Sequence, residues 1–440
     1  MSDYDATATP ERGRGKLCAR LVEPGELVPD AGNGLLGRRS FLRAGLGAAG
    51  GIALMQAVPA SAERPGHMRS PGPGMSEYGS PAPAEANVKR IGIGSQRGTT
   101  GSGASRSPLE HLHGIVTPSG LHFERHHAGV PEIDPDRHNI LIHGLVKRPL
   151  LFSMEALARY PTVSRLQFLE CSGNSGTLLA AEPPQLSCGE LHGLVSGSEW
   201  GGVPLALLLD EAGVLPAARW LVAEGADAAV MSRSVPLAKG MDDAIIALYQ
   251  NGERLRPENG YPARLFLPGW EGNMSVKWLR RINVTAQPAM TKDETSKYSD
   301  LQPDGSSLLF TFPMAVKSVI TSPSPGLGMQ GPGLYQISGI AWSGNGRIRR
   351  VDVSADGGTS WAPAALDDPV LPKSLTRFTT AWRWDGSPGV LLSRAVDETD
   401  AVQPTRESLM RQRAAGAFYH YNAIQAWRVS EAGEVNNVYV

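Results

Sequence analysis

The sequence predicts a two-part fold, an α+β domain over residues 109–300 followed by an all-β sandwich over residues 301–440. Up to about residue 300, strand-like apolar runs alternate with short helical patterns that carry their own start and stop signals. Beyond that point, short alternating runs are separated by turn residues, with no helical pattern between them. Regular short strands without helices are typical of a β-sandwich.

Four elements of the first domain are predicted from local signals. Residues 138–146 form a strand that ends at Gly144, and Ser153 caps a short helix. Residues 163–170 form a second strand that leads directly into a glycine-containing turn. Residues 203–211 form an apolar helix stopped by Gly213.

The second domain is expected to hold several short strands. A hairpin turn is predicted at 356–358, where Asp-Gly-Gly separates two alternating runs. The expected strands cover residues 335–342, 348–354, 377–384, 390–396 and 423–429.

Composition excludes some partners. The 440 residues are 41% hydrophobic and 19% charged, and Lys+Arg 42 against Asp+Glu 43 leaves a net charge of −1. That balance offers no general attraction to nucleic acid or to an acidic membrane surface. Specificity is therefore expected to come from a local site.

The N-terminus predicts export. Residues 37–43 read Gly-Arg-Arg-Ser-Phe-Leu-Arg, a twin-arginine box, and an apolar stretch at 44–58 precedes Pro59-Ala60-Ser61-Ala62. The stretch is too short for a membrane span, and its glycines disfavour a buried core helix. We therefore expect residues 1–62 to be a signal peptide for a periplasmic protein, removed after Ala62. The twin-arginine route carries proteins already folded around a cofactor.

Residues 63–108 are rich in Pro, Gly and Ser and are expected to form a flexible arm. Removal of the leader takes Cys18 and leaves Cys171 and Cys188. A disulfide between these two is one interpretation, because the destination is oxidising. The other is a metal ligand, since a strand delivers Cys171 to the turn Ser172-Gly173-Asn174, where a bulky group can approach the backbone. The residues alone leave both open.

Seven motifs are spaced along residues 123–298. They are Phe123-Glu124-Arg125-His126-His127, Cys171, Gly225-Ala226-Asp227, the run 251–264 with Gly260-Tyr261-Pro262, Leu267-Pro268-Gly269-Trp270, Val276-Lys277-Trp278-Leu279 and Tyr298. In this order they resemble the sulfite oxidase family of molybdopterin enzymes over nearly all of residues 109–440.

The resemblance implies one molybdenum per chain, held by the pterin dithiolene of molybdopterin and by Cys171 as the protein's metal ligand. It implies catalytic roles for Arg125 and Tyr298. The C-terminal domain would be an immunoglobulin-like sandwich that forms a homodimer. The implied cofactor-binding residues are Phe123, Arg125, His126, His127, Cys171, Asp227, Asn259, Arg264, Ser275, Val276 and Lys277. Candidate dimer anchors are Trp342, Trp361, Trp382 and Trp384, with filling of the sandwich core as the alternative.

Two departures favour one branch of the family. Sulfite-oxidising relatives carry arginine where this chain has Ser175-Gly176, which removes a charged fork and is expected to open space beside the metal. Asn259 stands where histidine is usual. Both, with the loop 270–273, look more like the sulfane dehydrogenase branch, whose substrate is sulfane sulfur on a carrier protein and whose acceptor is a c-type cytochrome.

No Cys-x-x-Cys-His occurs in the sequence, so no covalent haem is expected in this chain. Four hypotheses for the function remain open. The first is carrier-bound sulfane oxidation, and the second is a periplasmic sulfite dehydrogenase that uses free sulfite. The third is a metal-free secreted binding protein on the same fold. The fourth is a sulfoxide-repair reductase with the same cofactor, which the C-terminal β-domain disfavours.

Overall fold

The computed structural model describes residues 29–36, 66–93, 99–414 and 417–440. Two compact units are distinguished, and of the first only residues 66–73 are described. Everything below concerns the second unit, within residues 29–36 and 74–440. The twin-arginine box, the apolar stretch and the expected cleavage site lie outside the described residues.

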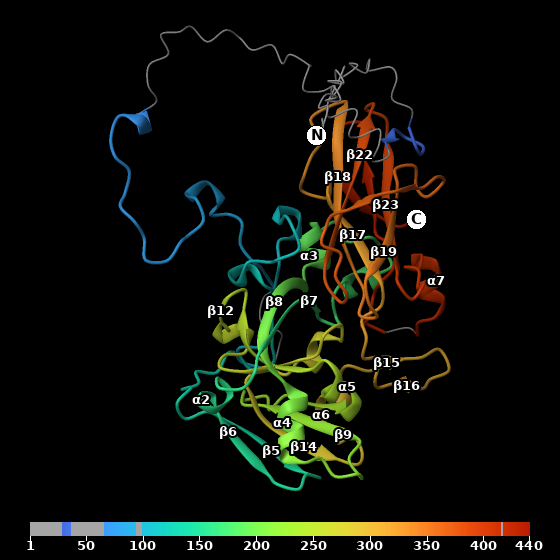
Figure 1. Cartoon of the computed structure of the whole chain (residues 1–440). Coiled ribbons are helices and arrows are strands. Elements are labelled where there is room, and N and C mark those ends of the chain that lie inside the picture. Colours follow the sequence, from blue (N-terminus) through green and yellow to red (C-terminus); the bar gives the residue numbers. More distant parts are fainter. Residues whose placement is uncertain (1–28, 37–65, 94–98, 415–416) are drawn as a thin grey trace, which may run out of the picture. The chain divides into compact units, whose positions relative to one another are not determined.

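One mixed and one antiparallel sheet build the first domain, whose strands β5, β6, β9 and β14 are labelled in Figure 1. One sheet has the order β10-β9-β14-β5-β6, in which β14 and β5 are parallel and the other pairs are antiparallel. Its strands are β5 (Asn139–Gly144), β6 (Leu150–Ser153), β9 (Trp220–Gly225), β10 (Ser232–Pro236) and β14 (Leu279–Thr285). The second sheet has the order β12-β11-β8-β7, with β13 paired to β11. Its strands are β7 (Val163–Glu170), β8 (Val195–Pro204), β11 (Ile245–Gln250), β12 (Glu253–Arg254) and β13 (Arg264–Phe266).

The α+β prediction is confirmed for this domain, and the local signals act as expected. The Ser153 Oγ accepts a hydrogen bond from the Ala156 backbone N–H at 3.1 Å and so caps α2. Gly213 ends α4 in the left-handed region, at φ 74°. The helices of this domain are α2 (Met154–Leu157), α3 (Cys188–His192), α4 (Leu205–Ala212), α5 (Leu237–Asp242) and α6 (Lys292–Ser296). One further short helix, α7 (Arg406–Arg411), lies in the second domain, where the sequence predicted strands alone. No helix of the described part of the chain is long and apolar enough to cross a membrane.

The second domain is the predicted β-sandwich, drawn in orange and red in Figure 1. One sheet runs β1-β22-β18-β17 with β21 beside β22, and the other runs β20-β19-β23-β24-β25. The first comprises β1 (Leu35–Leu36), β17 (Lys317–Ser322), β18 (Gly333–Trp342), β21 (Ala365–Leu366) and β22 (Thr376–Trp384). The second comprises β19 (Ile348–Ser354), β20 (Ala362–Pro363), β23 (Gly389–Asp397), β24 (Ala426–Val429) and β25 (Val435–Val438). A small hairpin, β15 (Asp300–Leu301) with β16 (Ser307–Leu308), precedes them.

The tryptophans of this domain mostly fill its core. Trp342, Trp382 and Trp384 are 1% exposed or less and belong to one apolar cluster. Their expected role as surface anchors of a dimer is therefore wrong for this chain, and the core alternative holds. Trp361 is half-buried beneath the Arg394 guanidinium, which lies 4.4 Å from the centre of its ring.

Part of the arm predicted over residues 63–108 forms regular structure. Strands β2 (Ile91–Ile93) and β3 (Gly103–Arg106) form a three-stranded sheet with β4 (Glu124–His126). The register pairs Ala104 with Arg125 and Gly103 with His126. The expectation of flexibility is thus wrong for these strands, because they pair with the segment that carries predicted site residues.

Candidate functional site

A single cavity brings together the twelve side chains singled out from the sequence. It encloses about 670 Å³ of non-atom space, part of it open solvent, which is within the range of cofactor sites. The predicted residues on its wall are Phe123, Arg125, His126, His127, Cys171, Asp227, Asn259, Arg264, Ser275, Val276, Lys277 and Tyr298. They come from the segment around β4, the residues after β7 and after β9, β13 with the turns on both sides of it, and the link between α6 and β15. Their individual roles stay predictions, but their convergence is a structural fact.

Cys171 lies where β7 ends, in a loop fixed by backbone hydrogen bonds. Its N–H donates to the Leu194 carbonyl at 2.9 Å, and its own carbonyl accepts from the Asn174 N–H at 2.8 Å. The turn that begins at Gly272 packs so closely that a Cβ on Gly272 would stand 2.8 Å from the Glu170 carbonyl oxygen. Burial raises the pKa of the Cys171 thiol above its ordinary value. A buried thiol of this kind becomes a thiolate when a metal replaces its proton.

A buried polar network behind the cysteine ties this loop to the sandwich domain. The Lys317 ammonium lies 3.3 Å from Glu170 Oε1 and donates to Ser175 Oγ at 2.8 Å. The Trp342 indole N–H donates to the other Glu170 oxygen at 2.6 Å, and Asn174 donates to Oε1 at 2.9 Å. Lys317 and Glu170 are each 1% exposed. The residue before the cysteine is therefore held by two side chains of the second domain.

Buried cations line the opposite wall. Arg264 donates to the carbonyls of Asn259 at 3.0 Å and Ser275 at 2.8 Å, and its Nε has no partner among the described residues. The Lys277 Nζ lies 2.8 Å from His126 Nδ1 and donates to the Glu258 carbonyl at 2.9 Å. These hydrogen-bond partners are backbone carbonyls and an imidazole, and the carboxylates of Glu124 and Asp227 act on Lys277 only through space.

The free-energy cost of burying the Arg264 and Lys277 charges indicates an anionic ligand. Burial lowers the pKa of Arg264 to about 9, and burial together with the Arg264 charge lowers the pKa of Lys277 well below its ordinary value. Two buried positive groups that penalise each other are stabilised when an anion lies between them. A terminal phosphate fits this requirement, with arginine as a fork and lysine as a point charge. The residues present therefore fit a phosphate-bearing pterin cofactor.

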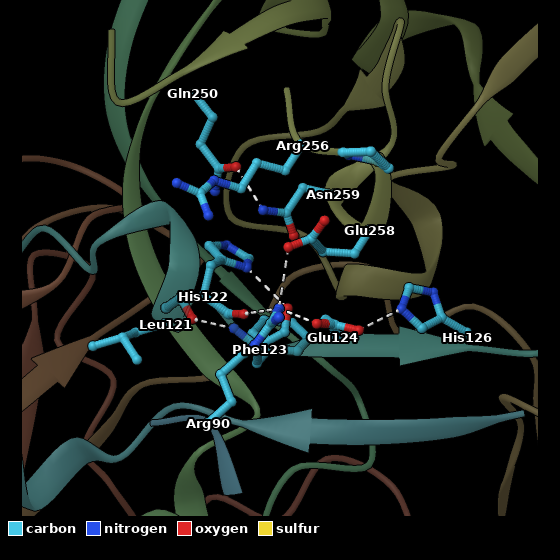
Figure 2. A network of polar contacts seen from close by, with 12 residues as sticks. Arg90, Leu121, His122, Phe123, Glu124, His126, Gln250, Arg256, Glu258 and Asn259 are labelled. Atoms are coloured by element: carbon cyan, nitrogen blue, oxygen red, sulfur yellow. Dashed lines mark hydrogen bonds and ion pairs between the residues drawn. The ribbon is translucent and has the colours of Figure 1, made fainter. Parts of the chain in front are cut away.

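The β4 side of the cavity is braced by Arg90, a residue of the predicted arm. Figure 2 shows its guanidinium among polar groups of this wall, and it pairs with the Glu124 carboxylate. It also reaches Glu258 Oε1 at 3.4 Å. Glu124 in turn contacts His126 Nε2 at 2.8 Å. The arm is thus part of the site's framework, which sequence reasoning missed because a lone arginine in a polar stretch carries no signal.

Tyr298 lines the cavity and is 6% exposed. It therefore lies in the site, where the resemblance places it, and not in an exposed loop. Its hydroxyl lies 2.8 Å from His127 Nε2, and the Arg233 guanidinium lies 5.3 Å from the centre of its ring. Burial lowers the pKa of His127 to about 3 and raises the pKa of Tyr298. Both groups are therefore neutral near pH 7, and the phenol retains its proton as a donor.

Three polar residues fix the remaining walls. Asp227 accepts a hydrogen bond from the Met231 N–H at 3.1 Å and keeps its second oxygen for other donors. Asn259 donates to Gln250 Oε1 at 2.8 Å, as Figure 2 also shows. Ser275 Oγ accepts from the Leu267 N–H at 3.1 Å. Val276 beside it is buried.

Further wall residues were not predicted. His122 precedes the first motif directly, is 1% exposed, and has no partner for Nε2 within the described chain. Asn273, from the loop that distinguishes this branch, donates to Ser172 Oγ at 3.1 Å behind the cysteine turn. Adjacency to the motifs was the available signal for both. The complete set of additional wall residues is His122, Leu169, Met231, Glu258, Gly272, Asn273 and Trp278.

The expected open space at Ser175-Gly176 is not found. Ser175 is buried and its Oγ lies 2.7 Å from His192 Nδ1. A Cβ on Gly176 would stand 2.7 Å from the Phe418 ring, which is itself 48% exposed. An aromatic side chain from the second domain therefore fills the space that a missing arginine was expected to leave. Arg413, an arginine of the second domain, pairs with Asp300 at 3.1 Å and does not line the cavity.

The two described cysteines are separate free thiols, which excludes the disulfide interpretation, while the ligand role of Cys171 stays a prediction. Cys188 is fully buried in the apolar cluster of the sandwich side, and Cys171 lies at the cavity. In the parts of the chain that the structure describes, no group of three His, Cys, Asp or Glu side chains is placed to hold a metal ion.

Comparison with known proteins agrees with this geometry. Residues 127–292 match the model of the oxidoreductase molybdopterin binding domain, and residues 310–426 match the Mo-co oxidoreductase dimerisation domain. Sulfite oxidase of Gallus gallus is 31% identical over 319 residues, covering 66% of this chain and 68% of that protein. An NADH nitrate reductase of Solanum lycopersicum is 31% identical over 346 residues, and the match spans 38% of that protein's length.

A solved structure extends the likeness to the whole fold. It is the crystal structure of the sulfane dehydrogenase SoxCD from Paracoccus pantotrophus, with a TM-score of 0.85 and 45% sequence identity. The match covers 87% of this chain and 99% of that one.

Proposed function

This chain belongs to the sulfite oxidase family of molybdopterin-dependent oxidoreductases, and on that premise we propose that it oxidises sulfane sulfur carried on a partner protein. The observation that carries the proposal is the likeness to the sulfane dehydrogenase structure at 45% identity over 87% of the chain.

We assign each part of the cofactor to particular residues of the cavity wall. Arg264 and Lys277 would hold the terminal phosphate, Asp227 would accept from donors of the pterin ring, and Cys171 would bind the molybdenum. When bound, molybdopterin supplies two-electron oxygen-atom transfer with water as the source of oxygen. The protein's own contribution is to orient this group, exclude bulk water and place charge near the reacting sulfur.

Arg125 and Tyr298 are the proposed substrate-facing groups. Both line the cavity with Cys171. The Arg125 guanidinium would attract an anionic sulfur group, and the Tyr298 hydroxyl, kept protonated by burial, would donate a hydrogen bond to developing negative charge. His127 would orient that hydroxyl from 2.8 Å.

The side chains around the Ser175-Gly176 turn favour a carrier-bound substrate over free sulfite. A small dianion needs converging cations, whereas here Ser175 is buried, Arg413 is paired with Asp300, and Phe418 presents a half-exposed ring beside the cysteine turn. Loss of one charge-assisted hydrogen bond costs about 1.5–3 kcal/mol, or about ten- to a hundredfold in affinity. An exposed aromatic ring is a suitable contact for a protein arm that delivers a persulfide.

The proposal includes partners and a location. Electrons would pass to a c-type cytochrome subunit, because no covalent haem motif occurs in this chain. The C-terminal domain would form a homodimer, in keeping with the description of its family model. The leader at 1–62 would send the folded protein to the periplasm, supported by the twin-arginine box.

Steady-state kinetics test the substrate assignment. The holoprotein from a molybdenum-competent host is assayed for metal content, then for cytochrome c reduction with sulfite and with a persulfidated carrier protein. We expect the carrier to be the better substrate by about tenfold or more in kcat/KM. Phe418→Ala is expected to lower kcat/KM for the carrier about fivefold, since half of an aromatic ring contributes about 1 kcal/mol, and to leave sulfite oxidation unchanged.

A periplasmic sulfite dehydrogenase is the second candidate, favoured by Arg125 at the cavity and by the similarity to sulfite oxidase. Equal efficiency with free sulfite and with the carrier would establish it in place of the first. A metal-free binding protein is the third candidate. It would be identified by molybdenum content near zero after expression in a competent host.

A further inference from the structure

A short segment of the predicted leader is docked on the sandwich domain. Residues 29–36 precede the twin-arginine box, and within them β1 (Leu35–Leu36) pairs antiparallel with β22. The register places Leu35 opposite Trp382 and Leu36 opposite Ala381. Leu35 is 0% and Leu36 1% exposed. These two leucines of the predicted leader are thus buried as deeply as the core residues of the sandwich domain.

The segment is held by hydrogen bonds as well as by apolar packing. The Trp382 indole N–H donates to the Asn33 carbonyl at 2.7 Å, and the Arg383 backbone N–H donates to the Gly34 carbonyl at 2.9 Å. Asn33 Nδ2 donates to the Ala355 carbonyl at 2.9 Å. These contacts reach both sheets of the sandwich, since Trp382 and Arg383 lie on β22 and Ala355 follows β19.

Residues 32–34 include two glycines at positions where a larger side chain would clash with the sandwich domain. Asn33 and Gly34 both have positive φ, 54° and 81°, and a Cβ on Gly34 would stand 2.1 Å from the Arg383 carbonyl oxygen. A Cβ on Gly32 would stand 2.2 Å from Asp356 Oδ2, and the Gly32 N–H donates to Ser360 Oγ at 2.7 Å. A close fit that depends on two glycines is typical of a specific complex between chain segments.

We propose that residues 29–36 are a docking element by which the leader binds the folded C-terminal domain, covering the edge of β22 at residues 380–383 until the leader is removed. The twin-arginine pair begins two residues after the docked strand, at Arg38. The binding surface exists only after the sandwich has formed, because it combines β22 with the turn after β19. The export box is thereby tethered to the finished domain, and leader removal vacates the strand edge. This inference rests on the leader assignment made above.

Hydrogen exchange of the intact chain tests the docking without reference to catalysis. The chain of 440 residues is produced in a host without the twin-arginine translocase, so that the leader stays attached. Mass spectrometry follows peptides that cover 30–36 and 378–384. We expect the Arg383 amide to exchange at least about tenfold more slowly than in the variant Leu35→Asp/Leu36→Asp, since a bonded, buried amide exchanges only on opening.

Matched variants separate docking from general damage. The same two changes at Leu21 and Leu27, outside the docked segment, should leave the exchange of 378–384 as in the unaltered chain. Gly34→Ala is a milder disruption that should also release both peptides while the remaining β-domain peptides keep their protection. Equal exchange at Arg383 in the unaltered chain and in both docking variants would overturn the proposal.

Hydrogen exchange of the exported, processed protein is the second measurement. After removal of residues 1–62, the Arg383 amide should exchange at least about tenfold faster than in the unprocessed chain. Continued protection would mean that something other than the leader covers this edge, which would contradict the proposal. A chain that is never processed would refute the export assignment alone, because the comparison of unprocessed variants would still decide the docking.

Discussion

Replacing Lys317 with methionine would test whether the sandwich domain holds the metal-binding loop through its buried charge pair. Methionine keeps most of the length and apolar surface of lysine and removes the ammonium. The change leaves the Glu170 carboxylate, 1% exposed, without the charge at 3.3 Å, although Trp342 and Asn174 still donate to it.

Breaking a buried ion pair from one side costs about 3–5 kcal/mol. The two remaining donors to Glu170 place the expected loss of unfolding free energy at the lower end, about 3 kcal/mol. The double variant Lys317→Met/Glu170→Gln should lose less than the sum of the single variants, by about 1–3 kcal/mol, because the second change removes the stranded charge.

Urea unfolding of protein from a molybdenum-deficient host measures these losses without a contribution from the cofactor. Lys147→Met is the matched control, since Lys147 is exposed on the surface, and it should change stability by less than about 0.5 kcal/mol. A loss below about 1 kcal/mol for Lys317→Met, or additive losses in the double variant, would refute the role given to this pair.

Cys171→Ser should yield folded protein with almost no bound molybdenum by metal analysis, because a hydroxyl is a poor ligand for a soft metal, whereas Cys188→Ala should keep its metal; equal retention by both would contradict the ligand assignment. Arg264→Gln should weaken cofactor retention by tenfold or more, since it removes a buried charge from the proposed phosphate site, and dialysis followed by pterin fluorescence would show this. Burial lowers the pKa of His420 to about 3, below the unfolded value of about 6.5, so the folded chain binds fewer protons than the unfolded chain between these values and stability falls as pH falls through that window. Between pH 7.5 and 5.0 this histidine should contribute about 2 kcal/mol to the loss, and urea unfolding of His420→Gln should show a correspondingly flatter pH dependence; an unchanged slope would exclude it.

Much of the site could be predicted from the sequence because its motifs are local. Strand β7 was predicted with the bounds it has, so the turn that carries Cys171 was placed correctly at its end. The periodicity of the second domain likewise predicted β19 as it is found. Local patterns of this kind depend on neighbours along the chain, which a sequence displays directly.

Other features depended on contacts that are distant in sequence. Arg90 reaches Glu258 across 168 positions, and Lys317 reaches Glu170 across 147. Phe418 fills the space beside Gly176 from another domain, so the absence of an arginine did not mean the absence of a side chain. The sequence by itself determined the family, the position of the cysteine and twelve residues of the cavity wall. Only the tertiary structure decided what supports that wall and which side chain fills the space beside Gly176, because packing brings together residues that no local pattern relates.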